Sequence, residues 1–195
     1  MQLVSILFFA VSANMDNFII GISYGIKKIK IHFYANLVIA AITCAGTVIS
    51  MLIGKALGFF LPERLGAIFG SVILISMGFY YIFKYVYNLV KKKFYGDWPI
   101  DHPEKFDKDN SGNIDLKESV VLGIALTLNN TCLGIGASIG GYNIAVSAGV
   151  IFIMSILTIF LGNMIGKSNI FNILEKYGDL VSGLIILTLG VSALR

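Results

Sequence analysis

Long apolar stretches alternate with short polar ones along almost the whole chain. An apolar run of roughly 18 or more residues can cross the hydrocarbon layer, which is about 30 Å thick, as an α-helix. We expect six such spans, at residues 3–26, 34–58, 66–89, 119–140, 144–166 and 178–194. A helix satisfies its backbone hydrogen bonds internally, as the hydrocarbon layer requires. The pattern therefore predicts an all-α integral membrane protein with six transmembrane helices.

The composition and the first span support the same class. The chain is 56% hydrophobic and only 13% charged, and its mean hydropathy is +0.83, well above the values of soluble domains. The first apolar run carries Asp16 near its centre and has neither a basic segment before it nor a clear cleavage site. We therefore expect a retained helix and no signal peptide. Cys44 and Cys132 lie within predicted helices, so no disulfide is expected.

The basic residues mark one side of the predicted membrane. They gather in the loops after the first, third and fifth spans: Lys27, Lys28, Lys30, Lys91, Lys92, Lys93, Lys167 and Lys176. The loops on the opposite side carry little basic charge, namely Arg64 between the second and third spans and Arg195 at the end of the chain. By the positive-inside rule both termini face outward and the loop at 91–118 is cytoplasmic. Anionic lipid headgroups of the cell membrane are the expected neighbours. No nucleic-acid binding is expected, because the lysines flank spans instead of lining one surface.

The two halves of the chain resemble each other. Residues 13–22, ANMDNFIIGI, align with 126–135, LTLNNTCLGI, and GAIFGSVILISMG from Gly66 aligns with GDLVSGLIILTLG from Gly178. Each half holds three predicted helices, so the second half enters the membrane from the opposite side. Many secondary transporters have this inverted-repeat plan, with the substrate site near the midplane. We divide the chain into a first repeat (1–90), a cytoplasmic linker (91–118) and a second repeat (119–195).

Residues 107–118 of the linker, DKDNSGNIDLKE, match the EF-hand calcium loop position for position. Such loops gather about six to eight oxygens around Ca²⁺ from alternate residues and turn at a glycine, here Gly112. The predicted ligands are five side chains and, at position 7, a backbone carbonyl: Asp107, Asp109, Ser111, Asn113 (the carbonyl), Asp115 and Glu118. The loop is single, whereas EF-hands usually pair. A solvated acidic hairpin is the alternative interpretation.

Asp16 is the one acidic residue predicted to lie deep in a span. At about 1.5 Å of rise per residue it lies about 20 Å from Leu3, near the middle of the hydrocarbon layer. An ionised carboxylate there costs at least about 2.5 kcal/mol on insertion scales, and a bound cation would offset that cost. A structural hydrogen bond or a protonated acid is the alternative.

Oxygen-bearing side chains occur at this depth in both halves. The candidate ligands of a transmembrane cation site lie on the first and fourth spans: Ser12, Asp16, Asn17, Thr127, Asn129 and Asn130. The crowding at 127–131 predicts either a packed polar interface or a locally irregular helix. Thr43 and Ser50 on the second span, and Ser155, Thr158 and Asn163 on the fifth, could complete the oxygen shell. Each of them alone is typical of helix packing.

The candidate ligands also limit the chemistry. Carboxylate, carboxamide and hydroxyl oxygens suit Mg²⁺, Ca²⁺ and Mn²⁺ better than Zn²⁺ or Cu²⁺. No pair of nucleophile and base and no cofactor motif stands out in the sequence. The chain is therefore not expected to be an enzyme.

The residues around Asp16 resemble a known family. Asn14, Met15, Asp16, Phe18 and Gly21, with the echo ALTLNN from Ala125, are similar to the manganese efflux pump (MntP) family. The SYG at residues 23–25 and the acidic loop before the fourth span look most like its sporulation membrane protein branch, YtaF. The resemblance implies a six-helix 3+3 fold, export of manganese or another divalent cation, and a central role for Asp16. The chain departs from the pattern at Asn129, where the family usually carries Asp.

Two functions from different classes remain. The first is a divalent-cation transporter, with manganese efflux favoured, in which Asp16 and Asn129 bind the ion and the Ca²⁺ loop regulates transport. The second is a membrane-anchored calcium sensor or sporulation assembly protein without transport activity. The buried Asp16 favours transport, because an inert anchor has no reason to keep it. Assembly into a homo-oligomer stays open.

Overall fold

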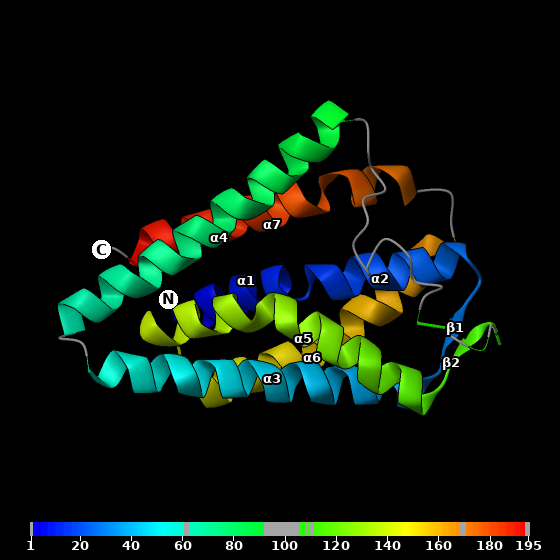
Figure 1. Cartoon of the computed structure of the whole chain (residues 1–195), viewed down its shortest axis with the longest axis horizontal. Helices are drawn as coiled ribbons and strands as arrows, with labels where there is room; N and C mark the ends of the chain where they lie inside the picture. The colour runs from blue at the N-terminus through cyan, green and yellow to red at the C-terminus, as the bar shows by residue number, and fades with distance from the viewer. Residues whose placement is uncertain are drawn as a thin grey trace.

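The computed structural model describes residues 2–60, 63–91, 106–107, 109, 111–167 and 171–193, and it leaves some side chains, Asn129 among them, undescribed. Its elements in chain order are α1 (Gln2–Ala13), α2 (Met15–Ile26), β1 (Lys30–Ile31), α3 (Phe33–Phe59), α4 (Glu63–Lys91), β2 (Asn113–Ile114), α5 (Leu116–Ile139), α6 (Ile144–Gly166) and α7 (Phe171–Ala193) (Figure 1). The described chain is all-helical apart from two strands of two residues each. The linker residues 92–105 lie outside the described residues.

Among the residues that the structure describes, three helices are long and apolar enough to cross a membrane unaided: Phe33–Phe59, Ile68–Tyr87 and Ile144–Gly166. Two bent pairs raise the number to five when each counts as one span: Leu3–Ala13 with Met15–Ile26, and Leu116–Leu128 with Asn130–Ile139. The sixth predicted span falls in α7, whose described residues include a shorter apolar stretch, Gly183–Ser192. The chain is therefore a multi-pass integral membrane protein, and its sixth crossing stays a prediction.

Helices from the two halves of the chain pack in pairs. α2 packs on α6, α3 on α5, and α4 on α7. The start of α1 and the end of α7 lie at one end of the bundle (Figure 1). β1 and β2 lie at the opposite end, which we call the loop end. The chain thus returns to the end of the bundle from which it starts.

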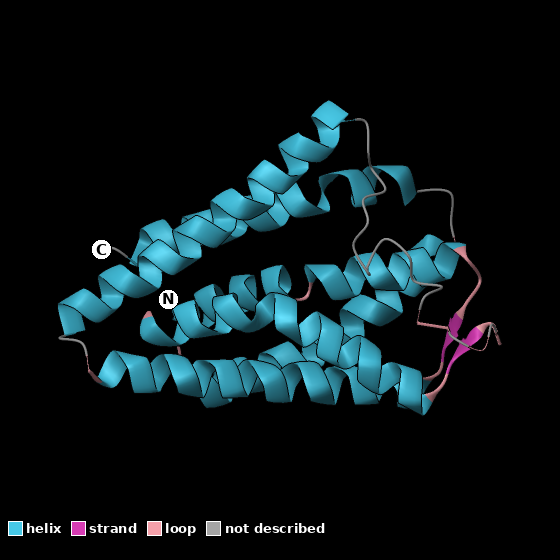
Figure 2. Ribbon diagram, in the orientation of Figure 1, coloured by secondary structure: helices cyan, strands magenta, loops and turns pink. Residues whose placement is uncertain are grey.

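The first predicted span is not one helix. The expectation of a continuous helix over 3–26 is wrong at Asn14, where α1 ends and α2 begins at an angle of 41°, as the short link in Figure 2 shows. Asn14 has φ −102° and ψ 9°, and its side chain donates to the Ala10 carbonyl at 2.8 Å. Asparagine favours such breaks because its amide competes for local backbone groups. A bend of 50° also separates Leu116–Leu128 from Asn130–Ile139 in α5.

Two apolar clusters of buried residues lie on either side of these breaks. The loop-end cluster draws on α2, α3, α5 and α6 and includes Ile20, Tyr24, Ile39, Phe106, Ile114, Leu122, Leu126 and Ile159. The far cluster draws on α1, α4, α5, α6 and α7 and includes Phe9, Ala13, Leu74, Leu133, Ala137, Ile151 and Ile186. The polar residues at the breaks therefore have apolar packing toward both ends of the bundle.

Glycines bring α2 and α6 into backbone contact. Gly21 and Gly25 on α2 face Gly162 and Gly166 on α6, each pair four residues apart. A Cβ added at Gly162 would lie 2.9 Å from the backbone nitrogen of Ile22, so only glycine fits there without a shift. Small residues at this spacing let membrane helices approach closely, where lipid supplies no hydrophobic drive. This contact positions the polar side chains of α2 against α6.

Gly162→Ala should destabilise the protein by about 1–3 kcal/mol, because the added methyl group overpacks the α2–α6 contact. Gly149→Ala is a matched control on the same helix, since a Cβ there meets no described atom within 4 Å. Both substitutions gain the same intrinsic helix propensity. Thermal unfolding in detergent, followed by the loss of a monodisperse peak, should therefore separate them. Equal midpoints for the two variants would contradict tight packing at Gly162.

Candidate functional site

Buried polar side chains form a layer between the two apolar clusters, at the break between α1 and α2. Asn14, Asp16 and Asn17 come from the break itself, and they are 1%, 3% and 0% exposed. Thr43 on α3 and Ser155 on α6 are likewise buried. The broken helix thus places a carboxylate and two carboxamides inside the bundle. The sequence predicts a cation site with oxygen ligands in this region.

Asn17 is at the centre of a hydrogen-bond chain in this layer. Its Nδ2 donates to Asn14 Oδ1 at 2.9 Å and to Ser155 Oγ at 2.8 Å. Ser155 Oγ lies 3.2 Å from Thr43 Oγ1. These hydrogen bonds therefore connect the break in the first span to helices α6 and α3.

Several buried oxygens in the described part of the chain have no hydrogen-bond partner there: Ser12 Oγ, Asn17 Oδ1, Asn36 Oδ1, Asn130 Oδ1 and Ser147 Oγ. Asn17 and Asn130 occupy equivalent positions when residues 13–22 are aligned with 126–135. An unpaired buried carboxamide oxygen costs about 1–3 kcal/mol, so each of the two suits a bound cation or a hydrogen-bond donor.

The predicted transmembrane ligands divide into three groups. Ser12, Asp16 and Asn17 lie buried near the break in the first span, and Asn130 is buried in α5. Thr127 is half-buried, and its hydroxyl donates to the Gly123 carbonyl at 2.8 Å. This hydrogen bond is typical of helix packing, which is the alternative to a role as a ligand. The side chain of Asn129 lies outside the described residues. The structure therefore does not test its pairing with Asp16.

The sequence did not single out Asn14 or Asn36 as site residues. Asn14 orients Asn17, and Asn36 Nδ2 donates to the Ile156 carbonyl on α6 at 3.1 Å. The available signal was an asparagine within a run of apolar residues, because a carboxamide there needs a partner from another helix.

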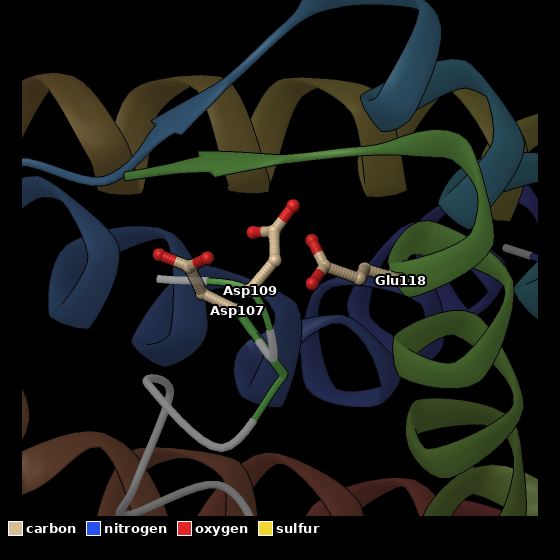
Figure 3. A group of neighbouring side chains, drawn as sticks. All are labelled: Asp107, Asp109 and Glu118. Carbon is tan, nitrogen blue, oxygen red and sulfur yellow. The ribbon is translucent and has the colours of Figure 1, made fainter. Parts of the chain in front are cut away.

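Three carboxylates of the 107–118 loop lie together at the loop end. Oxygens of Asp107, Asp109 and Glu118 lie within 4.8 Å of one another, and Figure 3 shows Asp109 and Glu118 facing each other. Asp107 and Glu118 are buried and Asp109 is exposed. Asp109 and Glu118 border a cavity of 290 Å³ that Phe106 and Val121 also line. The arrangement has the donor chemistry of a hard-cation site.

The first half of the loop folds around its own acidic side chains. Asp107 Oδ1 accepts from Ser111 N and its Oδ2 from Gly112 N, each at 3.0 Å. Gly112 has φ +71°, a conformation that glycine adopts without strain. Hydrogen bonds from Ser111 hold the pKa of Asp109 below its usual value, which favours its charged form. Ser111 Oγ donates to the Asn113 carbonyl at 2.9 Å, so these two predicted ligands are neighbours.

The last part of the loop caps α5. Asp115 Oδ1 accepts from Glu118 N at 2.7 Å, and Glu118 Oε2 accepts from Asp115 N at 3.1 Å. This reciprocal pair is a capping box, which satisfies two free donors at a helix start. The two predicted ligands at loop positions 9 and 12 therefore also fix the first turn of α5.

The loop is also attached to the first half of the chain. β1 and β2 pair in parallel, with Lys30 opposite Asn113 and Ile31 opposite Ile114, and Lys30 N donates to the Gly112 carbonyl at 2.9 Å. Ile114 is 1% exposed and belongs to the loop-end cluster. The sequence predicted a loop without a partner, and the strand after α2 provides one.

The fold and the polar layer define a multi-pass helical membrane protein with a broken first span and buried polar side chains beside the break. A family described as "Mntp: Putative manganese efflux pump" matches residues 1–82 and 99–194. The chain belongs to this family, so the resemblance predicted from Asn14–Gly21 is confirmed.

Individual relatives cover the whole chain. "Probable sporulation protein YtaF" of Bacillus subtilis (strain 168) is 32% identical over 210 residues, 98% of this chain and 99% of the relative. Two proteins named "Putative manganese efflux pump MntP" are more distant: 23% for Bacillus mycoides (strain KBAB4) and 24% for Bacillus cereus (strain G9842), each over 97% of this chain and 94% of the relative. No solved structure matches the chain.

Proposed function

We propose that the protein is a membrane transporter for a divalent metal cation, with manganese efflux as its activity. The observation that carries the proposal is the buried polar layer, in which Asp16 lies beside the break in the first span. Membership of the Mntp family supports the same function. A carboxylate in the middle of a membrane protein is costly unless it has a functional partner. We propose that the transported ion binds this carboxylate.

The proposal includes six spans arranged as two inverted three-helix repeats. The helix pairing supports this architecture, because exchanging the first and second repeats turns the α2–α6 pair into the α5–α3 pair and leaves the α4–α7 pair unchanged. Both first helices of the repeats also bend near the aligned residues, by 41° and 50°. Broken helices at the repeat interface are common in secondary transporters and line their binding sites.

We propose an alternating-access mechanism. The ion binds Asp16 and the carboxamides of the polar layer, and the two apolar clusters separate this layer from the two sides of the membrane in turn. Lysines of the loop end, including Lys27, Lys30 and Lys167, support a cytoplasmic location for that end. Efflux would then run from the loop end toward the termini, which face outward.

Asn129 distinguishes the proposed site from the family pattern. It offers a neutral oxygen at the position where the second repeat of the family usually carries Asp. A site with one carboxylate neutralises a divalent ion only in part, so we expect weaker binding and easier release than two carboxylates would give.

We further propose that the 107–118 loop binds Ca²⁺ and regulates transport. The cluster of Asp107, Asp109 and Glu118 supports a cation there. The loop reaches both repeats, through the β1–β2 pair and through the cap of α5. A calcium ion drawing Glu118 into its coordination would compete with the hydrogen bond from Asp115 N and change the start of α5.

A second candidate function is a membrane-anchored calcium sensor or sporulation assembly protein without transport activity. The observation in its favour is the relative named as a sporulation protein, which is more similar than the two relatives named as pumps. Under this function the loop is the active part, and cation flux is absent.

Neutralising Asp16 should remove transport. We expect Asp16→Asn to lower Mn²⁺ flux at least about tenfold, since a lost charge-assisted contact is worth about 1.5–3 kcal/mol, and Asp16→Ala to lower it further. Flux is measured in proteoliposomes that contain a Mn²⁺-quenched dye, with Ca²⁺ compared in parallel. Asp16→Glu is the control that keeps the charge. Undiminished flux in Asp16→Asn would rule out Asp16 as a ligand.

Glu118→Gln should weaken Ca²⁺ binding to the loop about tenfold and alter flux without abolishing it. Glutamine can still complete the capping box, so the start of α5 is preserved while one ligand charge is lost. Calorimetric titration of the purified protein measures the binding, and Lys117→Gln on the neighbouring exposed residue is the control. If Ca²⁺ affinity is the same in both variants, the loop is not the calcium site.

A further inference from the structure

We infer that Thr43 and Ser155 are positioning residues that fix the Asn17 carboxamide, so that its Oδ1 is a ligand for the transported cation. This inference rests on the proposed transport function and adds a ligand orientation to it. Thr43 lies on α3 and Ser155 on α6. The proposed site therefore depends on three helices that are far apart in the sequence.

The direction of each hydrogen bond in this network follows from Thr43, the residue farthest from Asn17 in it. The hydroxyl of Thr43 donates to backbone carbonyls of its own helix, Ile39 O at 3.0 Å and Ala40 O at 3.1 Å. A hydroxyl has one hydrogen to donate, so Thr43 Oγ1 is the acceptor in its contact with Ser155. The Ser155 hydroxyl therefore donates to Thr43, and its oxygen is left to accept from Asn17.

The orientation of the Asn17 amide follows from its other neighbour. Asn14 Nδ2 donates to the Ala10 carbonyl at 2.8 Å, which makes Asn14 Oδ1 an acceptor. The Asn17 atom 2.9 Å from that oxygen must therefore be the nitrogen. Rotating the amide by 180° would bring two acceptor oxygens together, so the usual uncertainty between amide oxygen and nitrogen is resolved here.

Asn17 then donates both of its amide hydrogens, and its Oδ1 is the one atom of the amide that the hydrogen-bond network leaves available. Asn17 is 0% exposed, and its Oδ1 has no partner among the described residues. Every donor in this hydrogen-bond network points toward the carbonyls of Ala10, Ile39 and Ala40 and away from Asn17 Oδ1. The network thus holds one neutral acceptor oxygen in a fixed direction, on the residue that follows Asp16 in the sequence.

A hard cation matches this oxygen better than an anion or a soft metal does. Carboxamide oxygens are ordinary ligands of Ca²⁺, Mg²⁺ and Mn²⁺, and a ligand that is already oriented loses less entropy on binding. Removing the hydroxyl of Thr43 would leave Ser155 free to turn and donate elsewhere. Asn17 would then lose its fixed direction without any direct change to the ligand.

Thr43→Val tests this inference because it removes the hydroxyl and keeps the shape. In proteoliposomes containing a Mn²⁺-quenched dye, we expect the KM for Mn²⁺ to rise about fivefold, the effect of one neutral hydrogen bond, with Vmax nearly unchanged. Thr47→Val is the matched control. Thr47 is buried one turn away on α3, and its hydroxyl donates to the Thr43 carbonyl of its own helix at 2.8 Å. Thr43→Ser keeps the hydroxyl and should restore the wild-type KM.

A second pair of variants covers the case in which Thr43→Val does not fold. Ser155→Ala should raise KM by at least as much, whereas Ser147→Ala, at a buried position two turns earlier on α6, should leave it unchanged. Ser147 Oγ has no partner within the described chain, so it has no role in holding Asn17. All five variants are compared only where their size-exclusion profiles match that of the wild-type protein.

The outcomes separate this inference from the function on which it rests. If the wild-type protein moves no Mn²⁺ or other divalent cation, the transport proposal fails and this inference fails with it. If the wild-type protein transports, but Thr43→Val has the same KM as Thr47→Val, or Ser155→Ala the same as Ser147→Ala, only the positioning role is overturned.

Discussion

Backbone contact between α2 and α6 is the interaction on which the rest of the structure depends. Gly21 and Gly162 have no side chains between them, so the two helices approach closely enough for Asn17 on α2 to reach Ser155 on α6. Lipid is as apolar as the helix surfaces, and therefore packing and hydrogen bonds must hold such helices together. The same contact that supplies packing also sets the geometry of the polar layer.

Burying the polar layer costs free energy, which the apolar packing on both sides of the layer must offset. Asn14, Asp16 and Asn17 are buried at a break in the first span, so their polar groups cost free energy unless they are hydrogen-bonded or bind an ion. The two apolar clusters close off this layer, and the loop-end cluster includes Ile114 of the 107–118 loop and Phe106, the residue just before it. The acidic loop is therefore part of the packing at one side of the proposed transport site. This physical link is what makes regulation by the loop a reasonable proposal.

Much of the fold could be predicted from local patterns. Hydropathy indicated the positions of the spans and the class of the protein, since the length and apolarity of a helix decide whether it can cross the membrane. The segment around Asp16 indicated the family. The break at Asn14 was missed because its immediate neighbours, Ala13 and Met15, are apolar and compatible with a helix. The β1–β2 pair was missed because two strands of two residues carry no periodic signal.

The sequence by itself determined the membrane class and the family, because these depend on composition and motif, and it predicted the depth of Asp16 from distance along the chain. Only the tertiary structure decided which polar groups meet. Thr43, Ser155 and Asn17 lie on three different helices, and no local pattern specifies their contact. It also separated Thr127, whose hydroxyl donates to backbone carbonyls of Gly123 and of Ile42 on α3, from Asn17, whose oxygen has no partner among the described residues. A hydrogen bond depends on distance and direction in space, and chain folding sets both.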